Sequence, residues 1–158
     1  MGHNTNALIG KMSINLEKIK FYGLAVAFEN DYAIIFLDES HLFHWYFKLK
    51  LDYHSDNEKL ELGGELVHFF AKEIGLEEYL LVHLSHYYYA ELYKNTIRTD
   101  EGEINLMLRK IGVEVIDKRN EFDELNLNEY RMPECFYWEG DANWAKLYKN
   151  IIGGYINK

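Results

Sequence analysis

The chain has 158 residues, of which 48% are hydrophobic and 27% are charged, and its formal net charge is −9. These proportions are typical of one globular domain, here expected over residues 1–158, and they exclude a disordered chain. The excess of acids disfavours direct binding to nucleic acid, because such binding rests on Lys and Arg side chains that neutralise phosphates. A basic protein partner fits this charge better.

The sequence predicts a cytoplasmic protein with no membrane or lipid attachment. Cys135 is the single cysteine, which excludes an intrachain disulfide and a CxxC pair and is typical of a reducing compartment. No run approaches the roughly 20 apolar residues of a membrane span, and the first residues show no secretory signal. Asn6 stands where myristoylation requires Ser or Thr.

The N-terminal part begins with a short apolar stretch at 7–9, and a brief helix is expected to follow it. Ser13 is the predicted N-cap of this helix, which extends through Ile19. Gly23 is predicted to end the chain's helical conformation after this helix.

Two β-rich runs, 24–29 and 32–38, predict a hairpin. Asn30 and Asp31 join the runs, and both residue types tolerate the positive φ of a tight turn. Both runs are almost continuously apolar, as strands covered on both faces are. We therefore expect this hairpin in the middle of a sheet.

Apolar residues recur at helical spacing in four later segments. Ser40 and Asp141 are the predicted N-caps of the first and the last of these segments, and a glycine follows each of the last three segments and ends the helix there. The four predicted helices span 40–49, 65–74, 104–111 and 141–151, and Gly75, Gly112 and Gly153 are the glycines that end helices.

The segment 79–93 alternates in polarity like a strand, although part of its spacing also suits a helix. Three successive tyrosines favour the strand. Residues 100–102 are interpreted as a break between two elements, and residues 113–116 are interpreted as a short strand. The elements together predict an α+β fold: a small, mostly antiparallel sheet that includes the 24–38 hairpin, with three to five helices packed on it.

The segment 117–144 combines charge with aromatic surface, since it holds eight acidic and three basic residues among six aromatic ones. Asp141 and Trp144 are assigned to the last helix, so the predicted partner-binding surface narrows to 121–139. Two interpretations stay open: the rings anchor a partner, or they turn inward and cover the core. The candidate partner-binding residues are Asp123, Glu124, Glu129, Glu134 and Glu139 for charge, and Tyr130, Tyr137 and Trp138 as anchors.

These features favour a non-enzymatic protein that neutralises or sequesters a basic partner. Small cytosolic immunity proteins against nuclease-type bacterial toxins, and phage-encoded inhibitors, share this composition. A self-associating structural protein, with a homodimer formed through aromatic surface, is an alternative. No cofactor is expected, because no GxSxG, P-loop, GxGxxG or HExxH motif is present.

Two HxxH spacings raise the question of a metal site, because imidazoles three residues apart on a helix can share one metal. His41 and His44 would lie on the polar side of a helix, away from its apolar stripe. His83 and His86 would point to opposite faces of a strand. We therefore expect ordinary surface histidines, with a histidine-centred, metal-dependent hydrolase as the alternative.

Two His-x-Thr/Ser triplets also occur, His3-Asn4-Thr5 and His83-Leu84-Ser85. This pair resembles the paired motifs of 2H phosphoesterases. The resemblance implies two histidines that act as acid and base on a phosphodiester, with the hydroxyls holding its phosphate. It covers six residues, and Asn4 stands where the family has an apolar residue.

Overall fold

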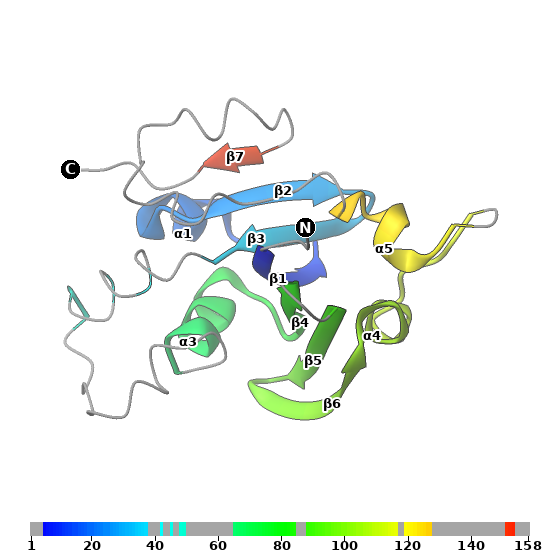
Figure 1. Ribbon diagram of the computed structural model, residues 1–158. Helices are drawn as coiled ribbons and strands as arrows, with labels where there is room; N and C mark the ends of the chain where they lie inside the picture. The colour runs from blue at the N-terminus through cyan, green and yellow to red at the C-terminus, as the bar shows by residue number, and fades with distance from the viewer. Residues whose placement is uncertain are drawn as a thin grey trace.

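The computed structural model describes residues 5–37, 42, 45, 48–49, 65–84, 88–116, 119–127 and 151–153. Within them, one sheet has the strand order β6-β5-β4-β1-β3-β2-β7, and all neighbouring strands are antiparallel (Figure 1). This confirms the predicted α+β fold. The strands are β1 (Thr5–Lys11), β2 (Ala25–Glu29), β3 (Tyr32–Phe36), β4 (Glu78–Leu84), β5 (Tyr88–Lys94), β6 (Ile97–Glu103) and β7 (Ile151–Gly153); the helices are α1 (Leu16–Tyr22), α3 (Glu65–Ile74), α4 (Ile104–Lys110) and α5 (Glu121–Glu124).

The sheet carries helices on both faces. On one face Ile9 and Ile34 pack with α4 and α5, and on the other Leu8 and Ile35 pack with α1 and α3. Neighbouring residues of a strand point to opposite faces. The continuous apolar runs of the central strands therefore supply both cores.

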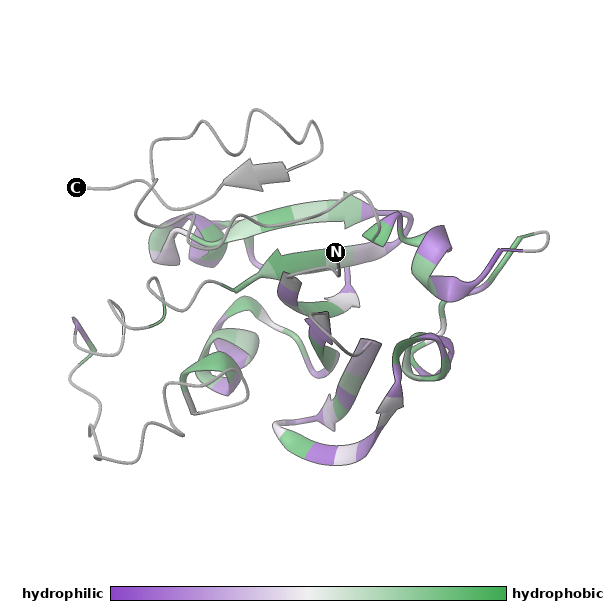
Figure 2. Ribbon diagram, in the orientation of Figure 1, coloured by the Kyte–Doolittle hydropathy of each residue, from purple (hydrophilic) through white to green (hydrophobic). Residues whose placement is uncertain are grey.

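The predicted hairpin is confirmed as β2 and β3, whose register pairs Glu29 with Tyr32. Asn30 takes a φ of 54°, which an asparagine in a tight turn tolerates. All but one of the residues in the two strands are buried, and both strands lie inside the sheet. Figure 2 shows the resulting apolar band along β2 and β3.

The N-terminal part contains a strand that the sequence did not reveal. The apolar stretch at 7–9 is the centre of β1, which lies between β4 and β3. The predicted cap Ser13 is wrong by two residues: Asn15 caps α1, and its side-chain oxygen accepts hydrogen bonds from the backbone N–H groups of residues 17 and 18. Asparagine is as good an N-cap as serine, so the cap position needs the backbone to decide it.

The region from 79 to 103 differs most from the prediction. The expected strand 79–93 is two antiparallel strands, β4 and β5, and the expected break at 100–102 lies inside β6. The polar run of β6 is compatible with a strand because β6 lies at the end of the sheet and is largely exposed. The short strand expected at 113–116 is absent, and those residues have no regular structure.

The predicted helices 65–74 and 104–111 are confirmed as α3 and α4. In the segment 40–49, Leu42 and Trp45 are buried and helical, while Ser40 lies outside the described residues. The final helix was predicted to include Ile151, which is wrong, because Ile151 pairs with Ala27 in β7. The rest of that prediction lies outside the described residues. None of the helices within the described part of the chain is long and apolar enough to cross a membrane.

Replacing Thr96 by glycine is expected to stabilise the protein. Asn95 and Thr96 form the two-residue link between β5 and β6, and both have positive φ, 52° and 66°. This conformation is unfavourable for a β-branched residue and natural for the Asn-Gly pair of a tight hairpin. The expected gain in the free energy of unfolding is about 0.5–1 kcal/mol, after the entropy cost of glycine.

Thermal and urea unfolding of the Thr96→Gly variant measure this gain. The matched control is Thr99→Gly in β6, where φ is not positive and glycine is expected to destabilise the strand by about 0.5–1 kcal/mol. A loss of stability in both variants would contradict the assigned turn.

Candidate functional site

The acidic segment that the sequence singled out begins at α5, and only its first part is described. Asn120 caps this short helix by accepting a hydrogen bond from the Asp123 N–H at 2.9 Å. Of the candidate partner-binding residues, Asp123 and Glu124 fall within the described part. The other candidates stay predictions and lie outside the described residues: Glu129, Tyr130, Glu134, Tyr137, Trp138 and Glu139.

Two acids of α5 hold the helix against the protein. The Glu124 side chain is 4% exposed; its carboxylate pairs with Arg119 at 2.6 Å and accepts the Ile116 N–H at 3.2 Å. The Glu121 carboxylate is also buried and pairs with Arg109 of α4 at 2.9 Å. Because these two carboxylates are almost inaccessible to solvent, their ion pairs fix the position of α5 and offer little charge to a partner protein. Glu124 thus contacts its own chain, and its role in partner binding stays a prediction.

The pKa of the Glu121 carboxyl reflects this placement. Burial by itself raises that pKa, but the hydrogen bond from Arg109, a backbone hydrogen bond and the charge of Arg109 outweigh burial. The pKa therefore lies below its ordinary value, and Glu121 is ionised at neutral pH.

The first aromatic ring of the segment turns inward. Phe122 is buried, and its ring stacks on that of Tyr88 with 5.3 Å between centroids and 14° between planes. The Phe122 N–H also donates to the side-chain oxygen of Asn105 at 2.8 Å. Of the two interpretations left open by the sequence, the second therefore applies to Phe122, whose ring turns inward and covers the core. Tyr88 is 45% exposed and extends the stack to the surface.

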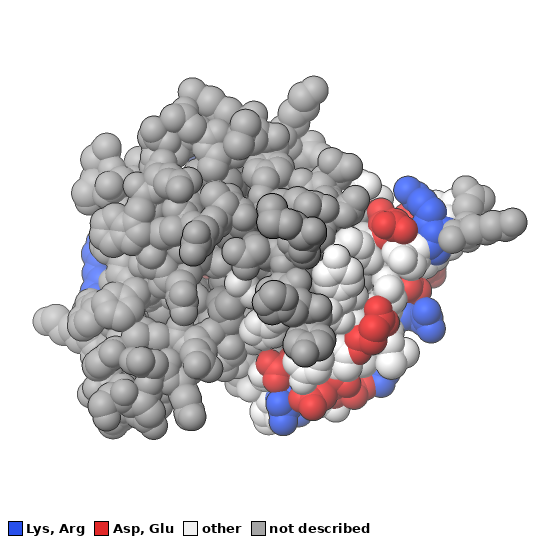
Figure 3. All heavy atoms as spheres, in the orientation of Figure 1, with Lys and Arg blue, Asp and Glu red and all other residues white. Residues whose placement is uncertain are grey.

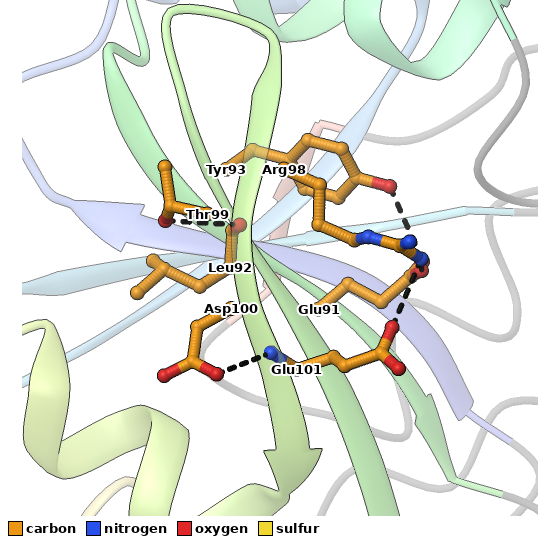
Figure 4. A network of polar contacts seen from close by, with 7 residues as sticks. All are labelled: Glu91, Leu92, Tyr93, Arg98, Thr99, Asp100 and Glu101. Atoms are coloured by element: carbon orange, nitrogen blue, oxygen red, sulfur yellow. Dashed lines mark hydrogen bonds and ion pairs between the residues drawn. The ribbon is translucent and has the colours of Figure 1, made fainter.

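A second polar site lies on β5 and β6, where the guanidinium of Arg98 lies between two carboxylates (Figure 4). Its Nη1 donates to Glu91 at 2.8 Å and contacts Glu101 at 2.9 Å. Tyr93 donates its hydroxyl to Glu91 at 3.3 Å. Burial raises the pKa of Tyr89 to about 12, helped by the hydrogen bond to Glu101. The site therefore carries one cation, two anions and two neutral phenols.

The same face continues toward α3 through aromatic rings. Tyr93 stacks on Tyr79 at 5.5 Å, and the Tyr79 hydroxyl lies 2.7 Å from Nδ1 of His68. Burial raises the pKa of Tyr79, so its phenol keeps the proton that it can donate to the imidazole. These contacts tie α3 to the sheet.

The histidines do not form a recognisable site within the described residues, where no group of three or more metal-ligating side chains occurs. His83 lies in β4, and burial lowers the pKa of its imidazole while the charge of Glu91 opposes the shift. In the register of β1 and β4, Thr5 of the first His-x-Thr/Ser triplet pairs with Leu84 of the second, and Asn6 pairs with His83. The rest of the first triplet and Ser85 lie outside the described residues, so the 2H phosphoesterase resemblance stays a prediction. His3, His41, His44 and His86 lie outside the described residues.

Sequence reasoning missed Glu91, Arg98 and Glu101. One signal was present in the sequence. Tyr89, Glu91 and Tyr93 alternate with apolar residues, and the turn residue Asn95 follows, a pattern that suits a strand with one polar face. The acid run after it was interpreted as a break because strands are usually poor in Asp and Glu.

Comparisons with protein-family models, with curated proteins and with solved structures find no match for this chain. Its function is therefore inferred from its own residues.

Proposed function

We propose that this chain is a cytoplasmic, non-enzymatic binding protein that grips a basic protein and blocks it, as an immunity protein blocks a nuclease-type bacterial toxin. A phage-encoded inhibitor would work in the same way. The formal net charge of −9 supports a basic protein partner, because opposite charges accelerate encounter. The same charge repels nucleic-acid phosphates.

The difference in exposure among the acids of α5 carries the proposal. Glu121 and Glu124 are buried and bound to arginines, so α5 is held in place, whereas Asp123 is exposed. Asp123 directly follows Phe122, whose ring stacks on the partly exposed Tyr88. An exposed carboxylate on a helix that is held in place fits the charged rim of a protein interface, and the exposed Tyr88 is of the residue type enriched as an anchor there.

Reversing the charge of Asp123 to lysine is expected to weaken partner binding by roughly three- to tenfold, mainly through slower association. The matched control is Glu17→Lys. Glu17 is also an exposed acid in the first turn of a helix, but α1 packs on the opposite face of the sheet. Both reversals oppose a helix dipole in the same way, so a difference between them reports the partner surface.

The measurement uses the intact chain as immobilised bait in an extract of its native cell, at increasing salt, with quantitative mass spectrometry. A basic protein whose recovery falls with salt and with Asp123→Lys, but not with Glu17→Lys, supports the proposal. Equal recovery with both variants, or no basic protein, would contradict it. A concentration-dependent dimer in light scattering, without such a partner, would support self-association instead.

A further inference from the structure

β6 is an open edge of the sheet. It stands at one end of the strand order and pairs only with β5 among the described strands, so one row of its backbone N–H and C=O groups has no strand partner there. Ile97 is 68% exposed, and five of the seven residues of β6 are exposed. Such an edge is a template for an added strand unless its side chains prevent pairing.

The side chains of β6 make this edge acidic. It carries Asp100, Glu101 and Glu103 against the single cation Arg98, which Glu91 and Glu101 already bind. Asp100 also pairs with Lys110 of α4, and Glu103 caps α4 by accepting the Leu106 N–H at 3.1 Å, so the acids of this edge still outnumber the cations that contact them. Figure 3 shows acidic side chains gathered with a few basic ones along the lower edge of the molecule, where Figure 1 places β6. An incoming strand therefore meets a negatively charged row.

The two faces of this edge differ. Glu101 pairs with Glu91 and Glu103 pairs with Tyr89, so these acids share the face of the polar site described above. Gly102 belongs to the other face, beside α4, where a Cβ would first meet Met107 at 3.7 Å. The edge therefore offers carboxylates on one face and, on the other, a glycine that leaves room for a small side chain beside the buried Met107 of α4.

A second copy of this chain is a poor occupant. Two copies of β6 paired antiparallel about Asp100 would place Asp100 against Asp100, and a parallel pairing in register would oppose every acid to itself. Like charges directly opposite each other destabilise a pair of strands. A register centred between Thr99 and Asp100 would instead place Arg98 opposite Glu101, but β6 has three acids and one cation, so a strand with several cations complements it better than a second β6 does.

We propose that β6 binds an extended basic segment of the partner protein as an additional strand of the sheet. Lys or Arg at every second position of that segment contacts Glu101 and Glu103, and small apolar residues between them lie over Gly102. Main-chain hydrogen bonds supply affinity, and the alternate charges supply specificity. This inference rests on the proposed basic partner and names how that partner is held.

The test is a titration of the ¹⁵N-labelled full chain with a synthetic, end-capped peptide that alternates lysine and valine over the length of β6. Amide shifts are expected in β6 and β5. A peptide with glutamate in place of lysine is expected not to bind. A peptide with the same lysines but N-methylated valines keeps its charge and loses main-chain donors, so it is expected to bind about tenfold more weakly.

Two protein variants separate this inference from the proposed function. Glu101→Lys is expected to weaken binding about tenfold through like charge across the strands, whereas Glu17→Lys on α1 is expected to leave it unchanged. Thermal unfolding of both variants checks that each is folded. Amide shift changes confined to α5, with binding unchanged in Glu101→Lys, would overturn the edge strand while keeping an acidic partner surface. Absent shifts, or equal binding of the N-methylated peptide, would also overturn it.

Discussion

Replacing Phe70 by alanine is expected to lower the free energy of unfolding by about 3–5 kcal/mol. Phe70 is fully buried on α3, in the cluster that packs this helix on the sheet. Its ring meets that of Tyr22 on α1 with 5.1 Å between centroids. The truncation would leave a cavity where α1, α3 and the sheet meet, and a close-packed core relaxes only partly around such a cavity.

Urea unfolding at neutral pH measures the loss, and Phe21→Ala is the matched control. Phe21 is also an aromatic residue next to Tyr22, at 4.9 Å between centroids, but it is 67% exposed. Its truncation removes little buried surface and is expected to lower the free energy of unfolding by less than about 1 kcal/mol. Similar losses in the two variants would contradict the packing of α3 on the sheet.

The elements that the sequence predicted correctly are those determined by local pattern. The hairpin of β2 and β3 has continuous apolar arms and a two-residue turn, and α3 has an apolar stripe that ends at Gly75. The elements that it missed depend on distant partners. β1 has only three central apolar residues, and its position between β3 and β4 is set by pairing with residues 32–36 and 79–84.

Edge strands were missed for another reason. β6 reads IRTDEGE, and a strand at the end of a sheet does not need apolar residues on both faces. β7 has three residues, too few for any periodicity to distinguish a strand from the end of a helix. Both belong to the sheet through pairing that no local window contains.

The candidate site shows the same division between local and distant information. Sequence identified the acids of 121–124, but their roles depend on which of them meets an arginine. Glu121, at the start of the predicted surface, pairs with Arg109, twelve positions away on another helix, and this pairing gives its carboxylate a structural role. Charge density can therefore locate an acidic segment, while burial decides which of its acids remain for a partner.

Replacing Arg109 by methionine is expected to lower the free energy of unfolding by about 1–3 kcal/mol at neutral pH, because it leaves the buried Glu121 carboxylate without its partner. The Glu121 side chain is only 6% exposed, whereas Arg109 is 64% exposed. Most of the loss in free energy of unfolding therefore arises from the buried carboxylate left without a cation, and little arises from lost packing around the arginine. Urea unfolding from pH 3 to pH 8 measures both its size and its dependence on pH.

The dependence on pH follows from the pKa of Glu121, which lies below its ordinary value of 4.5 in the folded protein. The stability that this pair contributes is fully present above about pH 4.5 and is lost as pH falls through the lower folded pKa. Without Arg109, burial raises the folded pKa above 4.5, so the variant loses stability as pH rises through that raised value. The difference between the two proteins therefore grows from acid to neutral pH and then stays constant.

Two controls isolate the buried pair. Lys110→Met removes the neighbouring cation on α4, whose ion pair with Asp100 is largely exposed, and it is expected to cost less than about 1 kcal/mol. The double variant Arg109→Met with Glu121→Gln leaves no buried charge without a partner. Its loss in free energy of unfolding should be smaller than that of Arg109→Met alone at pH 7, and nearly independent of pH. Equal losses for Arg109→Met and Lys110→Met, or a pH-independent loss in Arg109→Met, would show that Glu121 is not held by Arg109. In that case α5 would be anchored by Glu124 and Phe122, and the buried carboxylate of Glu121 would be held by its backbone hydrogen bond.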